Sequence, residues 1–196
     1  ITINDEPFVA IDTLDVRIRR ITQSTPGNDL LLLRPDSRTT ELIGRDRDIE
    51  DFMAWLNSDA PISVRVVVGG AGAGKTRLAI ELMLKLAEND APEPWCTGFV
   101  NFQHLRTFDL KPSLTQADWP QPTLLVVDYA AIETSLLKPW ITYLAQLVSE
   151  DSHVRILLIE RNADAQRGWL NELLAWGGDT SPGLSGVFDP PVPIAL

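Results

Sequence analysis

Apolar residues recur along this chain at two different spacings, and each spacing predicts a kind of element. Ile49, Phe52, Met53 and Leu56 fall on one face of a helix that we expect to begin at Asp46. Acidic residues fill its first turns, where the positive end of the helix dipole favours them. The pattern therefore predicts an amphipathic helix.

Short apolar runs alternate with helical stretches over the rest of the chain. The expected strands are Ile62–Val68, Cys96–Phe102, Thr123–Asp128, Val154–Ile159 and a last short one at Val192–Leu196. The further expected helices are Arg77–Glu88, Thr134–Ser149 and Asp164–Ala175. Runs that are apolar throughout are typical of strands covered on both faces. Because strands and helices alternate, the sequence predicts a three-layer α/β domain with a parallel sheet and right-handed crossovers.

Two stretches lack this rhythm. Residues 1–40 contain turn signals and short apolar runs, and we interpret them as a linker or small hairpin packed on a main domain of residues 41–196. Residues 103–122 contain Pro112, Pro120 and Pro122 and predict an irregular connection. Because the chain begins with Ile, we expect it to be a piece of a longer protein.

The segment 69–76 carries the most specific chemistry. It matches the G-x-x-x-x-G-K-[ST] phosphate-binding loop and lies between an expected strand and an expected helix, which disfavours the alternative of a glycine-rich turn without a ligand. In such a loop the glycines let backbone N–H groups approach the phosphates, the Lys75 ammonium reaches the β- and γ-phosphates, and the Thr76 hydroxyl binds Mg²⁺. The expected nucleotide-binding residues here are Gly69, Gly70, Ala71, Gly72, Ala73, Gly74, Lys75, Thr76 and Arg77.

Polar residues also end two later apolar runs. Asp128 follows Leu124–Val127, at the place where a P-loop protein carries the acid that orients Mg²⁺. An additional strand, expected at 96–102, indicates the branch of P-loop proteins in which the phosphate loop and this acid are not on adjacent strands. Arg161 ends the next run, where its guanidinium could face the γ-phosphate; a salt bridge that caps the sheet is the structural alternative.

Composition narrows the classes of function. The chain has 196 residues, 44% hydrophobic and 22% charged, which is typical of a globular protein. Its net charge of −10 argues against a broad nucleic-acid surface, although a local basic patch could form at Arg17, Arg19 and Arg20. No apolar run is long enough to span a membrane. The single Cys96, which we expect to be a core residue, fits a cytoplasmic location.

Four segments in this order resemble a known family. They are Leu42–Asp46, Gly69–Ala79, Leu124–Ala130 and Leu157–Arg161. Together they are similar to the bacterial STAND NTPases, the NLR-like signalling ATPases that are close to AAA+ proteins. The resemblance covers about residues 40–196, and the combination is much more specific than any single motif. It implies a P-loop NTPase domain of the ASCE branch, with lid and winged-helix domains absent from this chain.

The resemblance also implies roles for individual residues. Gly44 and Arg45 would lie near the adenine or the nucleotide hinge. Lys75 and Thr76 would hold phosphate and Mg²⁺, Asp128 would orient the metal, and Arg161 would act as the sensor. The implied cofactors are ATP or ADP with Mg²⁺. The implied partners are an effector domain before residue 1, a sensor domain after residue 196, and further copies of the parent protein in the ATP state, in stress sensing or antiphage defence.

One departure from the pattern bears on catalysis. Many ATPases of this branch place a second acid directly after the metal-binding Asp, and here that position holds Tyr129. Glu133 is the nearest acid and is the remaining candidate for polarising the attacking water. General-base assistance typically contributes about 10²–10⁴-fold to a rate. The sequence therefore predicts slow hydrolysis, suited to a switch.

Three other functions stay open on the sequence alone. An AAA+ motor or loader would need a trans-acting arginine, for which Arg155 and Arg167 are candidates. A small-molecule kinase would need a basic lid, and residues 103–122 offer only Arg106 and Lys111. The third alternative is a pseudo-NTPase that acts only as an interaction module.

Overall fold

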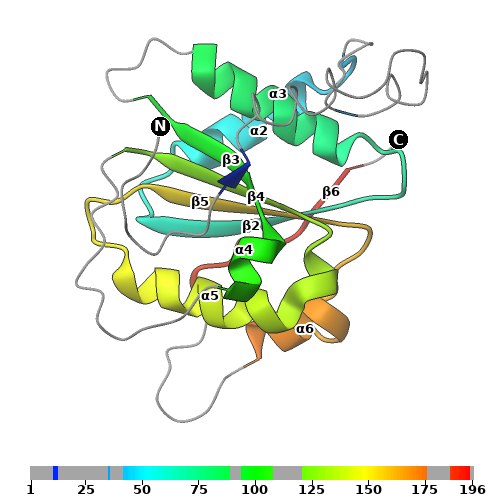
Figure 1. Ribbon diagram of the computed structural model, residues 1–196. Helices are drawn as coiled ribbons and strands as arrows, with labels where there is room; N and C mark the ends of the chain where they lie inside the picture. Colours follow the sequence, from blue (N-terminus) through cyan, green and yellow to red (C-terminus); the bar gives the residue numbers. More distant parts are fainter. Residues whose placement is uncertain are drawn as a thin grey trace, which may run out of the picture.

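A six-stranded sheet forms the centre of the computed structural model, in the order β1-β3-β4-β5-β2-β6 (Figure 1). The structure describes residues 11–12, 35, 42–88, 94–107, 121–175 and 186–194. The strands are β1 (Ile11–Asp12), β2 (Ile62–Val68), β3 (Cys96–Val100), β4 (Thr123–Asp128), β5 (Val154–Glu160) and β6 (Val192–Pro193). Neighbouring strands run parallel, except that β1 pairs with β3 in the antiparallel sense.

Helices cover both faces of this sheet, which gives three layers (Figure 1). The helices are α2 (Asp46–Leu56), α3 (Lys75–Glu88), α4 (Phe102–Thr107), the 3₁₀ turn η3 (Ala130–Glu133), α5 (Thr134–Leu147) and α6 (Gly168–Leu174). Side chains of α2 and α3 share one apolar cluster with one face of the sheet, and those of α5 and α6 share a second cluster with the other face. Successive residues of β5 alternate between the clusters, Leu158 in one and Ile159 in the other. The expected three-layer P-loop fold is confirmed.

The 69–76 loop and Asp128 both lie at the carboxyl ends of the parallel strands. β5 lies between β2, which leads into the 69–76 loop, and β4, which ends at Asp128. As expected, the strand before the phosphate loop and the strand that ends at Asp128 are not neighbours. The strand between them, however, is not the one expected at 96–102. That strand, β3, lies on the far side of β4. Sequence order could not reveal this, because β5 comes after both motifs in the chain.

Two expected element boundaries are wrong. The strand expected at Cys96–Phe102 ends at Val100, and α4 occupies the beginning of the stretch expected to be irregular. Asn101 explains this helix start, because its side-chain Oδ1 accepts the backbone N–H of Gln103 at 3.0 Å, as a helix cap does. The rest of that connection, residues 108–120, lies outside the described residues.

The helix expected from Asp164 begins four residues later, at Gly168. The Asp164 carboxylate accepts the backbone N–H of Gln166 at 2.9 Å and the Arg167 Nε–H at 2.7 Å. These bonds close a turn, and Gly168 leaves it with a φ of +67°, a conformation that favours glycine. The same two bonds hold the pKa of the Asp164 carboxyl below its usual value.

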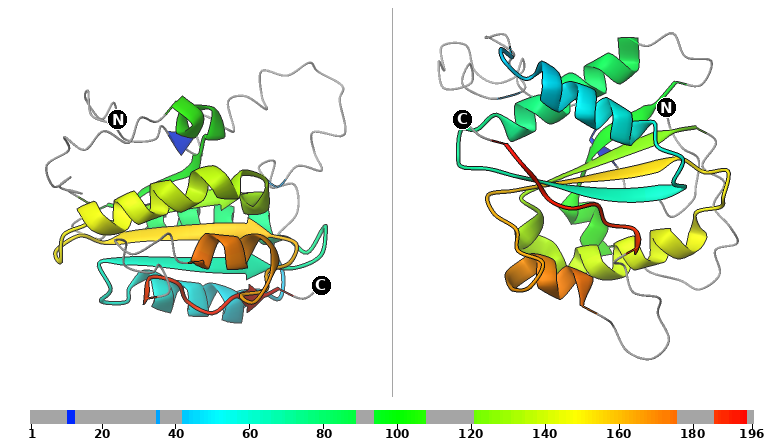
Figure 2. Two further views of the ribbon diagram at one scale, coloured as in Figure 1. Left: turned by 90° about the horizontal axis from the view of Figure 1, so that it is seen from below. Right: turned by 180° about the vertical axis from the view of Figure 1, so that it is seen from behind.

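The segment that ends in β6 runs alongside β2 at the edge of the sheet (Figure 2). Backbone bonds join it to β2 at Val64, which donates to Val187 O at 2.8 Å, and at Val68, which accepts from Ile194 N at 2.7 Å. The expected last strand is thus present as Val192–Pro193, and residues 195–196 lie outside the described residues.

Most of residues 1–40 lies outside the described residues, including the possible basic patch at Arg17, Arg19 and Arg20. The interpretation of this stretch as a linker or hairpin stays a prediction, although β1 does extend the sheet beside β3. In the part of the chain that is described, no helix is both long and apolar enough to cross a membrane.

Candidate functional site

The loop of residues 69–76 joins β2 to the first turn of α3. Gly72 and Gly74 have φ angles of +80° and +83°, which side chains with a Cβ rarely adopt. A Cβ built at Gly70, Gly72 or Gly74 would meet nothing within 4 Å, so the backbone here borders open space. Because backbone N–H groups at such a loop and helix N-terminus attract anions, this open side of the loop suits a phosphate group.

Gly69 needs to be glycine for a different reason. A Cβ at this position would lie 2.5 Å from the backbone oxygen of Ile194, in the segment that pairs with β2. Close approach of two backbones therefore fixes this residue, where the sequence pattern suggested access for phosphate. Ala73 is also structural, since it is buried in the cluster shared by α2 and α3, whereas Ala71 is exposed.

Lys75 folds back over the loop. Its Nζ donates to the backbone oxygens of Gly69 at 2.7 Å and Gly70 at 2.9 Å. The ammonium is thereby held above the glycines, within the curve of the loop. Both acceptors are neutral carbonyls, so an anionic oxygen that enters the loop would be a stronger partner for this charge.

Thr76 and Asp128 bring two oxygen groups together from different elements. The Thr76 hydroxyl at the start of α3 donates to Asp128 Oδ2 at the end of β4, over 3.0 Å. The second oxygen of the carboxylate, Oδ1, accepts the backbone N–H of Tyr129 at 3.1 Å. Mg²⁺ prefers such oxygen ligands and usually completes its octahedron with water and phosphate oxygens. The pair therefore fits the magnesium role expected for it.

Of the two residues expected near the base of the nucleotide, Gly44 and Arg45, the second contacts the same loop. Gly44 has a φ of +74°, which favours glycine. Arg45 follows and donates from Nη2 to the backbone oxygen of Ala73 at 3.0 Å, while its Nη1 pairs with Asp48 Oδ2 at 3.0 Å. This segment is thus tied to the phosphate-binding loop from the α2 side.

Arg77 lies one residue further along α3 and is engaged within the protein. Its guanidinium pairs with Glu81 Oε1 at 2.7 Å and donates to the backbone oxygen of Pro35 at 3.2 Å. Neither partner belongs to the loop. The inclusion of Arg77 among the nucleotide-binding residues stays a prediction.

Arg161 follows the carboxyl end of β5, between the two motifs. Its side chain is exposed, and none of the described residues accepts a side-chain hydrogen bond from it. Its backbone N–H donates to the Glu160 side chain over 2.7 Å. The salt bridge that would make it a structural cap is therefore not found within the described ranges, and a sensing role stays a prediction.

Glu160 is a residue that the sequence reasoning missed. It is level with Val68 of β2, and the preceding Ile159 is level with Asp128 of β4. A signal for it was present, because Glu160 ends an apolar run of the same kind as the one that ends in Asp128.

The turn after Asp128 contains both Tyr129, which stands where the second acid is usual, and Glu133. Tyr129 adopts a left-handed conformation (φ 59°, ψ 48°) and its side chain is 57% exposed. Glu133 forms an ion pair with Arg106 of α4. The nearest acid to Asp128 in sequence is thus held by a cation, and its role as a base stays a prediction.

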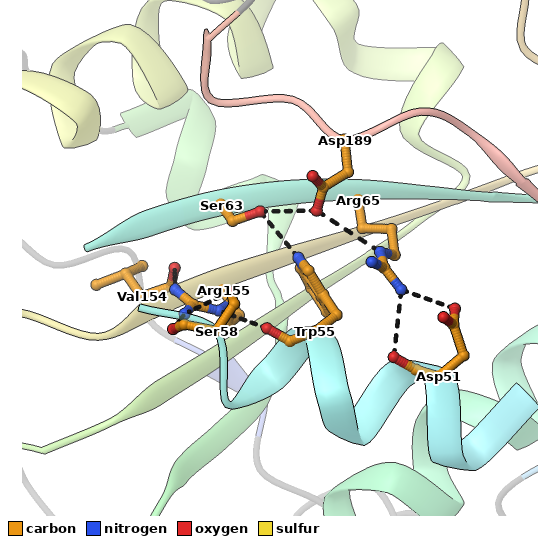
Figure 3. A network of polar contacts seen from close by, with 8 residues as sticks. All are labelled: Asp51, Trp55, Ser58, Ser63, Arg65, Val154, Arg155 and Asp189. Carbon is orange, nitrogen blue, oxygen red and sulfur yellow. Dashed lines mark hydrogen bonds and ion pairs between the residues drawn. The ribbon is translucent and has the colours of Figure 1, made fainter. Parts of the chain in front are cut away.

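The arginines considered for a motor protein lie elsewhere. Arg155 is fully buried at the amino end of β5, and its guanidinium donates to backbone oxygens near the end of α2 (Figure 3). A buried guanidinium cannot serve a neighbouring subunit, so Arg155 is excluded from that role in this conformation. Arg167 is exposed but pairs with Asp164. Cys96 is half-buried, and burial raises the pKa of its thiol, which disfavours a nucleophilic role.

Comparison with solved structures agrees with this fold. No protein-family model and no curated protein matches the chain. It is similar to Aeropyrum pernix ORC2, solved as ADPNP–ADP complexes, with a TM-score of 0.53 and 14% identity over 79% of this chain and 48% of that one. It is also similar to a chain of Drosophila ORC bound to GC-rich DNA and Cdc6, with a TM-score of 0.48 and 10% identity over 100% of this chain and 36% of that one.

These comparisons concern the fold alone. The chain spans about half the length of the Aeropyrum protein that it matches. At 14% identity, the likeness to the Aeropyrum protein shows the three-layer α/β fold and nothing of the role.

Proposed function

We propose that this chain is the ATP- and ADP-binding switch module of a larger signalling protein of STAND type. The observation that carries the proposal is the meeting of three groups at one edge of the sheet. Lys75 lies over the glycine loop, and the Thr76 hydroxyl and the Asp128 carboxylate lie 3.0 Å apart beside it. Their chemistry matches a triphosphate with its Mg²⁺.

The protein groups would act mainly by holding charge. The loop N–H groups would bind the phosphate oxygens, and Lys75 would exchange its carbonyl partners for the β- and γ-phosphates. Thr76 and Asp128 would position Mg²⁺, which neutralises charge on the phosphates when it is bound. Arg161, at the end of the strand between the two motifs, would contact the third phosphate and so distinguish ATP from ADP.

Slow turnover is part of the proposal. The position after Asp128 holds an exposed tyrosine, and the nearest following acid, Glu133, is paired with Arg106. A switch of this kind keeps ATP bound long enough for the parent protein to self-associate. We place that parent protein in the cytoplasm, with effector and sensor domains outside these residues and a role such as stress or antiphage defence.

Calorimetric titration of the 196-residue chain with ATP tests the site. Charge-assisted hydrogen bonds are worth roughly 1.5–3 kcal/mol, so Lys75→Ala should weaken ATP binding by about one to two decades. Lys85→Ala is the matched control, because Lys85 is exposed on the same helix, away from the loop. Equal affinity of the wild type and Lys75→Ala would overturn the assignment.

Two further measurements test nucleotide-dependent self-association and slow turnover. Size measurements on the parent protein in ATP and in ADP test nucleotide-dependent self-association, which should require ATP. A steady-state rate typical of a motor ATPase would instead favour the AAA+ motor or loader, and ATP binding without any turnover would favour a pseudo-NTPase.

A further inference from the structure

The Glu160 carboxylate joins two turns that border the proposed phosphate site. Its Oε1 accepts the backbone N–H of Ala131, in the η3 turn that follows Asp128, at 3.1 Å. Its Oε2 accepts the backbone N–H of Arg161 at 2.7 Å. One side chain thus sets the backbone position of the turn beyond the metal-binding acid and also that of the candidate sensor.

The position of Glu160 in the sheet suits it to this task. It ends β5, the strand between the loop strand β2 and the Asp128 strand β4. The residue before it, Ile159, belongs to the cluster shared with α3, and Leu158 belongs to the cluster shared with α5. Alternation along the strand therefore directs Glu160 to the α5 side, where η3 lies. No described cation forms an ion pair with its carboxylate, in contrast to Glu133.

We propose that Glu160 is a positioning residue that couples the turn after Asp128 to Arg161, so that the two respond together to the third phosphate. This inference rests on the proposed function. A displacement of Arg161 toward or away from a phosphate would be transmitted through the shared carboxylate to Ala131, three residues beyond Asp128. Glu160 acts through its neighbours and needs no contact with the nucleotide.

Amide chemistry provides a selective way to break this link. In the wild type the two backbone N–H groups bind different oxygens of the carboxylate. A glutamine in the same position has one acceptor oxygen and an NH₂ group that can only donate, so one of the two N–H groups would face a donor. Glu160→Gln keeps the size of the side chain and removes the coupling. Glu172→Gln on α6 is the matched control, because Glu172 is an exposed glutamate away from the sheet edge.

The experiment compares the preference for ATP over ADP, measured by calorimetry in Mg²⁺, among four chains: wild type, Glu160→Gln, Arg161→Ala and the double variant. We expect Glu160→Gln to lower the preference about fivefold with ADP affinity within about twofold of wild type, as loss of one charge-assisted bond permits. In the Arg161→Ala background the same change should have less than about a twofold effect, because residues that act as a unit are not additive. Glu172→Gln should change nothing.

Three results would overturn the inference. The first is an unchanged preference in Glu160→Gln, and the second is an effect of equal size with and without Arg161. The third is equal weakening of ADP and ATP, which is what a purely structural role would give. If Glu160→Gln does not fold, Glu160→Met, which has similar length and no acceptor, carries the same expectations. Failure of the proposed function would look different, since wild type itself would then not bind ATP and Lys75→Ala would have no effect.

Discussion

The cationic side chains at the two ends of the parallel strands differ in their surroundings. At the amino end, Arg155 is completely buried, and its guanidinium donates to the backbone oxygen of Ala60 at 2.8 Å. Figure 3 shows its further acceptors, the backbone oxygen of Trp55 at 3.2 Å together with Ser58 and Val154. At the carboxyl end, the Lys75 ammonium rests on two carbonyls of a loop that borders open space.

This difference separates a structural cation from one that is available to a ligand. The acceptors of Arg155 lie at the end of α2, in the turn that follows it and at the start of β5. A second arginine on this side of the sheet, Arg65 in the middle of β2, pairs with Asp51 at 2.9 Å and lies over the rings of Phe52 and Trp55. The acceptors of Lys75 belong to glycines that a phosphate could replace as partners. The Arg155 guanidinium therefore holds β5 to the end of α2, whereas the half-buried lysine rests on carbonyls beside open space, where a ligand could reach it.

The largest predicted effect is a loss of stability from a substitution at the amino end of β5. Arg155→Met removes the bonds from a buried guanidinium to several backbone oxygens. Because hydrogen bonds to charged groups are worth about 1.5–3 kcal/mol each, we expect a loss of about 3–5 kcal/mol in the free energy of unfolding. Burial lowers the pKa of Arg155 to about 10, and the negative charge of Asp189 partly offsets this lowering. Urea denaturation measures the loss, and the folded variant should bind ATP as wild type does.

Arg167→Met is the control for that prediction. Arg167 is exposed and pairs only with Asp164 among the described residues, and exposed pairs contribute about 0–1 kcal/mol. A loss below 1 kcal/mol for Arg155→Met as well, on the same urea scale, would mean that the amino-end network does not stabilise the fold.

The second prediction separates two neighbouring glycines of the loop. Gly69→Ala places a Cβ 2.5 Å from the backbone oxygen of Ile194, whereas Gly70→Ala meets nothing within 4 Å. Overpacking against a backbone typically costs about 1–3 kcal/mol, and we expect that loss for Gly69→Ala only. Thermal unfolding of the two variants measures it. Equal stabilities would show that the close approach of Ile194 to the loop is not maintained in solution.

These contrasts also show what sequence could and could not predict. The loop, the apolar strand ending in Asp128 and the amphipathic α2 were predictable, because each depends on residues that are adjacent in the chain. The sequence assigned Asp128 to the acid that orients Mg²⁺ and Thr76 to a Mg²⁺ ligand, and the two side chains do meet. The residue-level roles expected for the loop, Asp128, Arg161, Gly44 and Arg45 all stay predictions.

Long-range contacts account for what sequence could not give. The strand between the two motifs is β5, which follows both of them in the chain. The burial of Arg155 depends on backbone oxygens nearly a hundred residues away, for which no local pattern exists. Likewise, Gly69 resembles the other loop glycines in sequence, and only the approach of Ile194 distinguishes it.

The third prediction concerns the carboxyl end. Arg161 is exposed, and its side chain donates to none of the described residues, so its removal should cost little stability. Arg161→Ala should leave ADP affinity nearly unchanged and lower the preference for ATP by about tenfold, since an interaction made in one nucleotide state biases a two-state switch. Competition binding with ATP and ADP measures the preference. Equal weakening of both nucleotides, or unfolding of the chain, would make Arg161 a structural residue.

The smallest effect is predicted for Glu133. Its carboxylate is paired with Arg106, and its side chain is only 13% exposed, so we expect it to be a poor base for an attacking water. Removing a true general base typically lowers the rate by about 10²–10⁴-fold, whereas Glu133→Gln should lower ATP turnover by less than about threefold. Single-turnover hydrolysis, with Asp128→Asn as the variant that loses Mg²⁺-dependent activity, gives the comparison. A fast wild-type rate that Glu133→Gln abolishes would place the catalytic acid at Glu133 and make the ion pair with Arg106 a resting arrangement that opens during turnover.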